Sequence, residues 1–312
     1  MTIRIVTDST SDLSAELAKK SGITIVPMYV RFGTENYRDG IDITMDEFYQ
    51  RLTDTKVHPA TSQPTPSDFA KVYTELSSKG DQIVSIHVSS KLSGTYNSAL
   101  QGKEIAGPKC DVTVLDSESV TMGLGMMSLM AAQMSKAGAS LQQITEGIKQ
   151  AINYTHLMGT FDTLKYLVIG GRIGKAKALL GSVLNVKPVL TMREGELHPV
   201  SNVRTHSKGV EKLVEFVKSA LHVEELAVVH TTTPDEASSL KDRFLGIVES
   251  NHLHVARLGP ALGTYGGPGM LAVAFRTSPG GFEPKDEKSL IERIPKIHKP
   301  DIHMPKIHLP GR

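Results

Sequence analysis

The stretch "SIHVSSKLSGTYNSAL" (residues 85–100) joins three kinds of local sequence. An apolar run, "IVSIHV" (83–88), stops abruptly and is followed by a patch of hydroxyl residues that contains one glycine. A segment of helical character comes next. A buried strand, a polar turn and a helix, in this order, form the repeating unit of a parallel sheet. The stretch therefore predicts an α/β fold.

The same unit recurs on both sides of this stretch. Expected strands span 3–7, 23–30, 81–88 and 109–117, and helix-like segments separate them. Strands that alternate with helices predict a parallel sheet that is covered on both faces. Further expected features are a hairpin over 31–43 turning at Asp39-Gly40, an irregular loop over 58–66, a methionine-rich helical hairpin over 121–152, and a hairpin over 187–200 turning at Glu194-Gly195.

The length of 312 residues suits two packed domains. We expect an N-terminal α/β domain with polar loops over residues 1–160 and a smaller α/β C-terminal domain over 161–281 that closes a pocket. Residues 282–312 carry several prolines and histidines, and "PKIH" occurs in them twice. This composition predicts a disordered tail.

Composition excludes several classes of function. The formal net charge is only +2, and tryptophan is absent, so neither a long-range field nor stacking platforms for nucleic acid are present. The single cysteine, Cys110, allows no intrachain disulfide and no cysteine-based zinc site. The N-terminal stretch does not resemble a signal peptide, and no apolar run has the length of a membrane span. We expect a cytoplasmic protein with no metal site.

The hydroxyl patch after residue 88 predicts an anion site. Ligands of open α/β sheets bind outside the carboxyl ends of the strands, and the first amides of a helix attract anions. Ser93 has a hydroxyl to donate, and Gly94 lets an oxyanion approach the backbone closely. The alternative is that Ser93 only caps the following helix.

A second hydroxyl-rich loop, "ATSQPTP" (60–66), supplies Thr61 and Ser62 in front of another predicted helix. Here too a capped turn is the alternative. The loop contains no charged side chain. Hydroxyls and amides alone bind a carboxylate or phosphate in a dry site without a salt bridge, so the two loops together predict a neutral anion cradle.

Two glycine-rich stretches add candidates. "GTYGGPG" (263–269) allows close approach of a ligand, and Tyr265 within it has a phenol to donate; the alternative is a tight turn before the last strand. "GGRIG" (170–174) presents Arg172, the residue type that recognises phosphate or carboxylate, in a turn that favours a partner contact; the alternative is a solvated arginine.

The segment "VTMGLGMMSLMAAQM" (120–134) carries methionines at helical spacing. Methionine fills irregular apolar space and adapts to flexible ligands, so this segment is a candidate wall for a long apolar pocket. Packing in an ordinary core is the alternative.

Seven motifs, in order, resemble those of the DegV family, the fatty-acid-binding subunits of bacterial fatty acid kinase. They are "VTDSTSDL", "TSQPTP", "SSKLSGTYNSA", "LDS", "LKYLVIGGRIG", "KPVL" and "GTYGGPG", and the resemblance covers residues 2 to about 281. The resemblance implies a two-domain α/β protein with a fatty acid buried between the domains.

The resemblance also implies roles for individual residues. The threonine of the "TS" loop and the serine of "LSGT" bind the fatty-acid carboxylate in that family, and they match Thr61 and Ser93, with Ser62 and Gly94 adjacent. A histidine is frequent in the last glycine-rich motif, where this sequence has Tyr265. Arg172 matches a position that is associated with docking on the kinase subunit.

The function implied is that of a carrier without catalytic residues or a cofactor. It takes a long-chain fatty acid from a transient contact with the membrane surface and presents the carboxylate to a fatty acid kinase, which forms acyl phosphate. Two alternatives remain open at this point. One is a serine hydrolase or transferase that uses Ser93 with His87 or Tyr265, and the other is a binding protein for a small polar anion.

Overall fold

The apolar runs of the first half form a parallel sheet of four strands in the order β2-β1-β6-β7. The computed structural model describes residues 2–54, 57–77, 80–180 and 186–282. The strands are β1 (Ile3–Asp8), β2 (Ile23–Val26), β6 (Gln82–His87) and β7 (Val112–Asp116). The predicted parallel sheet is confirmed, because every strand pair within it is parallel.

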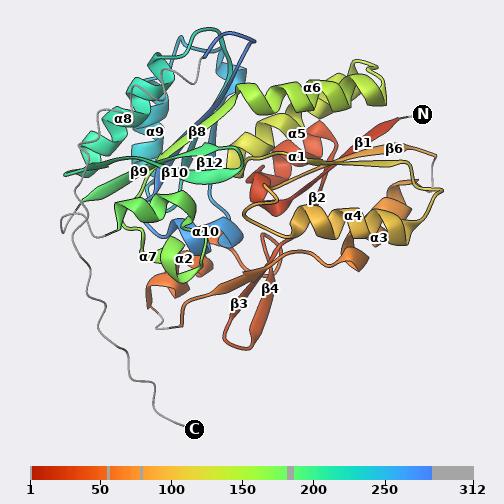
Figure 1. The fold of residues 1–312 in the computed structure, drawn as a ribbon, viewed down its shortest axis with the longest axis horizontal. Coiled ribbons are helices and arrows are strands. Elements are labelled where there is room, and N and C mark those ends of the chain that lie inside the picture. Colours follow the sequence, from red (N-terminus) through yellow and green to blue (C-terminus); the bar gives the residue numbers. More distant parts are fainter. Residues whose placement is uncertain (1, 55–56, 78–79, 181–185, 283–312) are drawn as a thin grey trace.

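Helices cover both faces of this parallel sheet (Figure 1). They are α1 (Ala15–Ser21), α3 (Pro66–Ser77), α4 (Thr95–Ala106), α5 (Thr121–Lys136) and α6 (Leu141–Tyr154), and the short 3-10 helix η1 (Ser9–Ser11) follows β1. α3 and α4 pack together on one side, whereas α1 and α5 lie on the other. The predicted helical hairpin is confirmed, with its break at Gly138, where φ is +85°.

The second half forms a mixed sheet of six strands in the order β10-β9-β8-β13-β11-β12, of which only the pair β11–β12 is parallel. Its strands are β8 (Thr155–Thr160), β9 (Lys187–Arg193), β10 (Glu196–Val203), β11 (Val223–His230), β12 (Leu253–Arg257) and β13 (Leu271–Thr277). The predicted turn at Glu194-Gly195 joins β9 to β10. The chain thus has an α/β fold with a parallel N-terminal and a mixed C-terminal sheet.

The helices of the second half are α7 (Lys165–Ile169), α8 (His206–Lys218), α9 (Pro234–Asp242) and α10 (Pro260–Gly266), with the 3-10 helices η2 (Gly174–Leu179) and η3 (Ser250–His252). α5 contacts both large sheets, so one apolar core spans the two halves. The mixed sheet has more strands than the parallel one, and its strand β8 ends at residue 160. The domain division at that residue stays a prediction.

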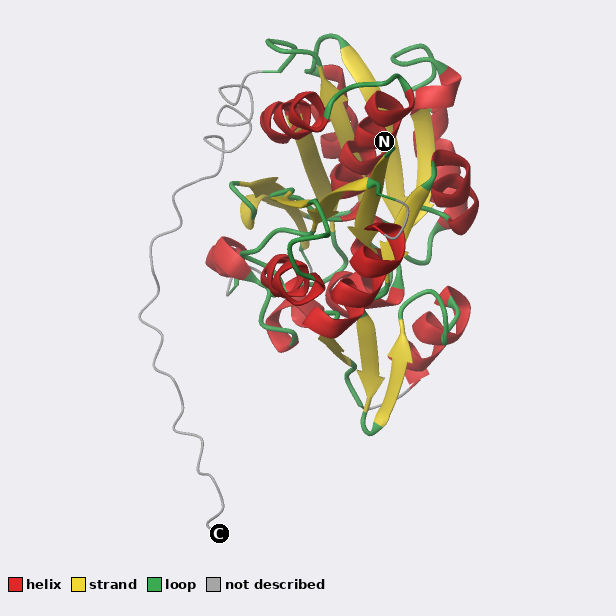
Figure 2. Ribbon diagram, turned by 90° about the vertical axis from the view of Figure 1, so that its right-hand side faces the viewer, coloured by secondary structure: helices red, strands yellow, loops and turns green. Residues whose placement is uncertain are grey.

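A third, antiparallel sheet of three strands corrects the prediction for residues 23–66. It contains β3 (Tyr29–Phe32), β4 (Glu35–Arg38) and β5 (Ala60–Ser62), and α2 (Met45–Asp54) lies between β4 and β5 in the chain. The β3–β4 hairpin projects at the lower end of the molecule in Figure 2. The expected irregular loop over 58–66 is wrong, because β5 lies within it and pairs with β3.

The predicted turn of this hairpin at Asp39-Gly40 is also wrong. β3 and β4 are joined at Gly33-Thr34, where Gly33 adopts a φ of +61°. Asp39 follows the hairpin and is buried, with the Ser9 hydroxyl donating to its carboxyl group at 2.8 Å. The Asp-Gly pair thus has a tertiary role that its turn-like sequence does not reveal.

The tail that we expect from residue 282 lies, from residue 283 on, outside the described residues. Phe282 itself is buried and packs against Phe216, Phe275 and His156. In the described part of the chain, no helix combines the length and the apolar character needed to cross a membrane.

Candidate functional site: a cavity between the two large sheets

A cavity lies where the strand ends of the parallel sheet face the mixed sheet. Its volume is about 110 Å³, counted as space open to the centre of a water molecule. A single buried water needs on the order of 10–15 Å³ on that measure, so the space suits a larger ligand. Thr10 and Val88, which follow β1 and β6, contribute to one wall. Leu157 of β8 and Ala272 of β13 contribute to the opposite wall.

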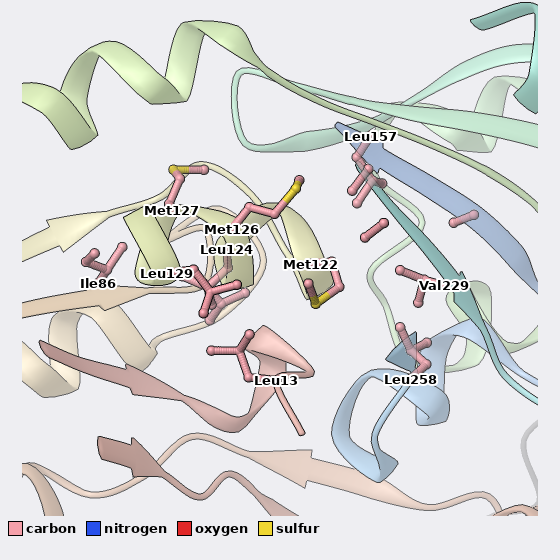
Figure 3. Close-up of a cluster of buried hydrophobic side chains, with 14 of the residues drawn as sticks. Leu13, Ile86, Met122, Leu124, Met126, Met127, Leu129, Leu157, Val229 and Leu258 are labelled. Carbon is pink, nitrogen blue, oxygen red and sulfur yellow. The ribbon is translucent and has the colours of Figure 1, made fainter. Parts of the chain in front are cut away.

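Most of the cavity wall is apolar. The apolar lining side chains come from β8, β9 and β10, from α7 and α10, and from the segments beside them; they include Leu157, Phe161, Leu167, Leu190, Leu197, Leu258, Leu262 and Met270. Leu157 and Leu258 also belong to the core that Figure 3 shows. A wall of this kind favours the apolar part of a ligand and disfavours a buried charged group.

The predicted hydroxyl residues gather at one polar part of the lining. Thr61, Ser62, Ser93 and Tyr265 all line the cavity. The Thr61 hydroxyl and the Tyr265 phenol form a direct hydrogen bond, although 204 residues separate them in the chain. Thr61 is placed there by the pairing of β5 with β3, and Tyr265 is placed there by α10.

Ser93 lies one residue before the N-cap of α4, and its role in binding an anion stays a prediction. Its Oγ lies 2.8 Å from the Thr95 hydroxyl and accepts the Thr95 amide at 3.3 Å, and Ser93 also lines the cavity. Gly94 is the N-cap residue and does not line the cavity itself. A Cβ at Gly94 would lie 2.8 Å from Gln63 Nε2, so the glycine makes room for a lining residue that the sequence analysis missed.

Arg172 lies at the cavity while it remains exposed to solvent. Its Nε donates to the Leu92 carbonyl at 3.2 Å, and its guanidinium group stacks on the Tyr265 ring at 5.3 Å. Among the described residues that line the cavity, it is the one with a charged side chain. Arg172, for which the sequence predicts a partner contact, therefore also supplies positive charge to the polar part of the cavity.

Two buried carboxyl groups, which the sequence analysis did not identify, hold the beginning of α10. Gly259 N–H donates to Asp12 at 2.8 Å, and the backbone N–H of Ala261 donates to Asp39. Tyr49 adds a hydrogen bond of 3.0 Å to the Leu258 carbonyl. Because α10 carries Tyr265, these contacts position the phenol relative to the parallel sheet.

Burial raises the pKa of Asp39 from 3.8 to about 7, although hydrogen bonds from Ser9 and Ala261 oppose the rise. The folded protein therefore binds a proton at Asp39 over a pH range in which the unfolded chain has lost it. The stability that this group contributes is fully present below pH 3.8 and is lost as the pH rises towards about 7.

The free energy of unfolding of the wild-type protein is therefore expected to fall between these two pH values. We expect Asp39→Asn to make this fall smaller, measured by urea denaturation at several pH values. An unchanged pH profile would contradict this expectation.

A buried chain of hydrogen bonds joins β1, β6 and α3. His87 Nδ1 lies 3.0 Å from Asp8 Oδ2, and its Nε2 lies 2.7 Å from Ser85 Oγ, to which Tyr73 donates at 2.8 Å. Asp8, Ser85, His87 and Tyr73 are fully buried. Both ring nitrogens of His87 are thus engaged away from Ser93. The arrangement does not supply the base that a hydrolase reaction at Ser93 requires.

The methionines of α5 do not line the cavity as proposed from the sequence. Met122, Met126 and Met127 are at most 1% exposed and pack in the core between the sheets (Figure 3). Their alternative interpretation, ordinary core, is confirmed. Helix α5 is buried between the two large sheets, and a helix in such a position is apolar on most of its surface. Its methionines therefore pack against the sheets and not against the cavity. Among the described residues, no group of three or more His, Cys, Asp or Glu is arranged to hold a metal ion.

A family model described as "Uncharacterised protein, DegV family" matches residues 2–278. The chain belongs to the DegV family. A DegV domain-containing protein of Deinococcus radiodurans is 36% identical over 279 residues, which are 88% of this chain and 98% of that protein. Another, from Streptomyces coelicolor, is 38% identical over 277 residues, or 87% and 97% of the two chains.

Solved structures of other DegV proteins share the fold. One from Thermus thermophilus, described as showing the fatty acid binding of a DegV family protein, is 34% identical and superposes with a TM-score of 0.82 over 89% of this chain and 100% of that one. DegV of Bacillus subtilis, described as a fatty acid binding protein, is 28% identical with a TM-score of 0.79 and covers the same shares. A stearic acid-binding protein from Eubacterium ventriosum is 28% identical and superposes with a TM-score of 0.78, over 88% of this chain and 98% of that one.

Proposed function

We propose that this DegV protein binds a long-chain fatty acid in the cavity between its two large sheets. One observation carries the proposal: among the described residues, a predominantly apolar cavity brings the hydroxyls of Thr61, Ser62, Ser93 and Tyr265 together with Arg172 in its lining. An amphipathic ligand with one anionic group and a long apolar chain matches both parts. The descriptions of the Thermus and Bacillus proteins as fatty acid binding support this ligand class.

The apolar chain supplies most of the affinity in this proposal. Each methylene that leaves water contributes about 0.8 kcal/mol. A long acyl chain therefore offsets the loss of translational freedom on binding and is retained through purification. A small polar anion has no such chain, and the apolar wall gives it no compensating contact, so that alternative is disfavoured.

The carboxylate is assigned to the hydroxyl cluster. Thr61, Ser93 and Tyr265 have hydroxyl groups to donate, Ser62 lies beside them, and Arg172 supplies a positive charge that is exposed at the same place. Hydrogen bonds to an ionised acceptor are roughly twice as strong as neutral ones. In the ligand-bound protein, the Thr61–Tyr265 hydrogen bond gives way to contacts with the carboxylate.

We further propose that the protein acts in the cytoplasm as a carrier and not as an enzyme. It acquires the fatty acid at a membrane surface in a transient contact and presents the carboxylate to a fatty acid kinase, which transfers the phosphoryl group. Three features support this: the family membership, the engagement of both His87 ring nitrogens by Ser85 and Asp8, and the exposure of Arg172 next to the hydroxyl cluster.

The test is mass spectrometry of protein purified without added lipid. We expect an excess mass under native conditions that is lost on denaturation, and a long-chain fatty acid in the organic extract. The control is protein that has been stripped of lipid and then offered stearic acid or a short-chain carboxylic acid. Binding of neither acid by the stripped protein, together with an empty native spectrum, would refute the proposal.

A further inference from the structure

A carboxamide group lies at the same end of the cavity as the hydroxyl cluster. It belongs to Gln63, which follows Thr61 and Ser62 in the chain, lines the cavity and is exposed to solvent. The side chain therefore lies at the mouth of the cavity, where the polar part of the lining meets water. Within the described part of the chain, this carboxamide has no hydrogen-bond partner, so its NH2 group is free to donate to a ligand.

Gly94 makes room for this side chain. A Cβ atom at position 94 would lie 2.8 Å from Nε2 and 3.1 Å from Cδ of Gln63. Gly94 is the N-cap residue of α4 and directly follows Ser93, whose hydroxyl is assigned to the ligand carboxylate. The carboxamide thus covers the beginning of α4 beside the proposed head-group site.

The backbone on both sides of Gln63 is held in place. On one side, Ser62 belongs to β5, which pairs with β3. On the other side, the buried Ser98 hydroxyl of α4 donates to the carbonyl of Pro64. These contacts place Gln63 over Gly94, although the two residues belong to different elements.

A carboxamide suits this position chemically. It provides two N–H donors without a charge, so it binds a carboxylate in the same way as the neutral hydroxyls around it. Hydrogen bonds to an ionised acceptor are roughly twice as strong as those to a neutral one. A donor at the mouth therefore contributes more to the binding of an acid than to that of an alcohol with the same chain.

We propose that Gln63 is a further head-group residue, which closes the mouth of the cavity by donating from Nε2 to the ligand carboxylate. This inference rests on the proposed function. Thr61 and Ser93 contact the carboxylate from inside the cavity, and Gln63 contacts it from the solvent side. Gly94 is required for this arrangement, because a larger residue would displace the carboxamide.

The experiment measures the affinities for stearic acid and stearyl alcohol by displacement of a fluorescent fatty acid. Gln63→Met keeps the length of the side chain but removes its donors. We expect this variant to bind the acid about tenfold more weakly, the lower end of the range for a hydrogen bond to a charged group, because Gln63 is exposed. The affinity for the alcohol is expected to stay nearly unchanged.

A change of charge at the same position gives a second test. Gln63→Glu has the same shape and places a negative charge beside the carboxylate, so it is expected to weaken the acid more than Gln63→Met does. Gln101→Glu is the matched control. Gln101 is an exposed residue of α4 that does not line the cavity, about 10 Å along the helix axis from Gly94. Its substitution is expected to leave both affinities unchanged.

Gly94→Ala tests the position of the carboxamide. Gly94 has a φ of −76°, within the range of ordinary residues, so an alanine adds a Cβ without straining the backbone. We expect the same loss of affinity for the acid as in Gln63→Met. The double variant is expected to lose no more than either single one, because both changes remove the same contact. Losses that multiply in the double variant would contradict the assigned role of Gly94.

The outcomes separate this inference from the proposed function. Equal binding of stearic acid by the wild-type protein and Gln63→Met would overturn the role of Gln63 alone, and so would equal losses for acid and alcohol. If the wild-type protein binds neither ligand, the proposed function fails. The Gln63 variants change an exposed side chain, so they keep the test decisive even if Gly94→Ala does not fold.

Discussion

Replacing Asp8 by alanine is expected to lower the free energy of unfolding by about 3–5 kcal/mol, because several buried hydrogen-bond donors lose their acceptor at about 1–3 kcal/mol each. Asp8 is fully buried and accepts hydrogen bonds from Thr10, from the Val88 amide at 3.1 Å and from His87 at 3.0 Å. The alanine variant leaves all of these donors without an acceptor in a dry interior. It also removes the contact that joins the ends of β1 and β6.

The measurement is urea denaturation of the wild-type and variant proteins, followed by circular dichroism. Asp42→Ala is a matched control, because Asp42 also accepts a backbone amide and the side chain of one basic residue, Arg38. The Asp42 side chain is 35% exposed, against 0% for Asp8. Its bonds compete with water, so its loss is expected to change stability little. If the two variants lose the same stability, the buried network does not have the role assigned to it.

The second large effect concerns the carboxylate. We expect Ser93→Ala and Thr61→Val each to weaken fatty acid binding by about 1.5–3 kcal/mol, the range for a hydrogen bond to a charged group, which is roughly tenfold to a hundredfold in affinity. Both hydroxyls line the cavity beside Arg172. The apolar wall is unchanged in these variants, so the acyl chain contributes as before.

A fatty alcohol of equal chain length separates the head-group contribution from that of the chain. We expect the alcohol to bind the wild-type protein and both variants with similar affinity. Thr264→Val is the matched control for Thr61→Val, because Thr264 is a buried residue of α10 whose hydroxyl bonds to the Pro260 carbonyl and does not line the cavity. Equal losses for acid and alcohol, or an equal loss in Thr264→Val, would assign the effect to general disruption.

Several elements could be predicted from the sequence because their signals are local. The apolar run before Ser89 and the hydroxyl patch after it fixed a strand, a turn and a helix within a short distance. Gly22 ends α1 in the left-handed conformation, and Gly138 separates α5 from α6 in the same region of φ. Such positions depend on the intrinsic preference of a residue for a backbone conformation, which is the same in any fold.

Other elements depended on partners far away in the chain. The Asp39-Gly40 pair has the composition of a hairpin turn, but the buried Asp39 carboxyl instead contacts Ser9 and α10. The loop that holds Thr61 became a strand because β3 offered an edge to pair with. A local turn or loop preference amounts to a few tenths to about 1 kcal/mol, and tertiary pairing and burial override it.

The sequence by itself determined that this protein has a parallel sheet with hydroxyl residues at its strand ends, and the order of its motifs indicated the DegV family. Only the tertiary structure decided that Thr61 meets Tyr265, that Arg172 lies over the phenol ring, and that the α5 methionines lie in the core. The physical reason is range. Caps and periodicity act over a few residues, whereas a cavity between two sheets exists only after the whole core has packed and its side chains have filled the remaining space.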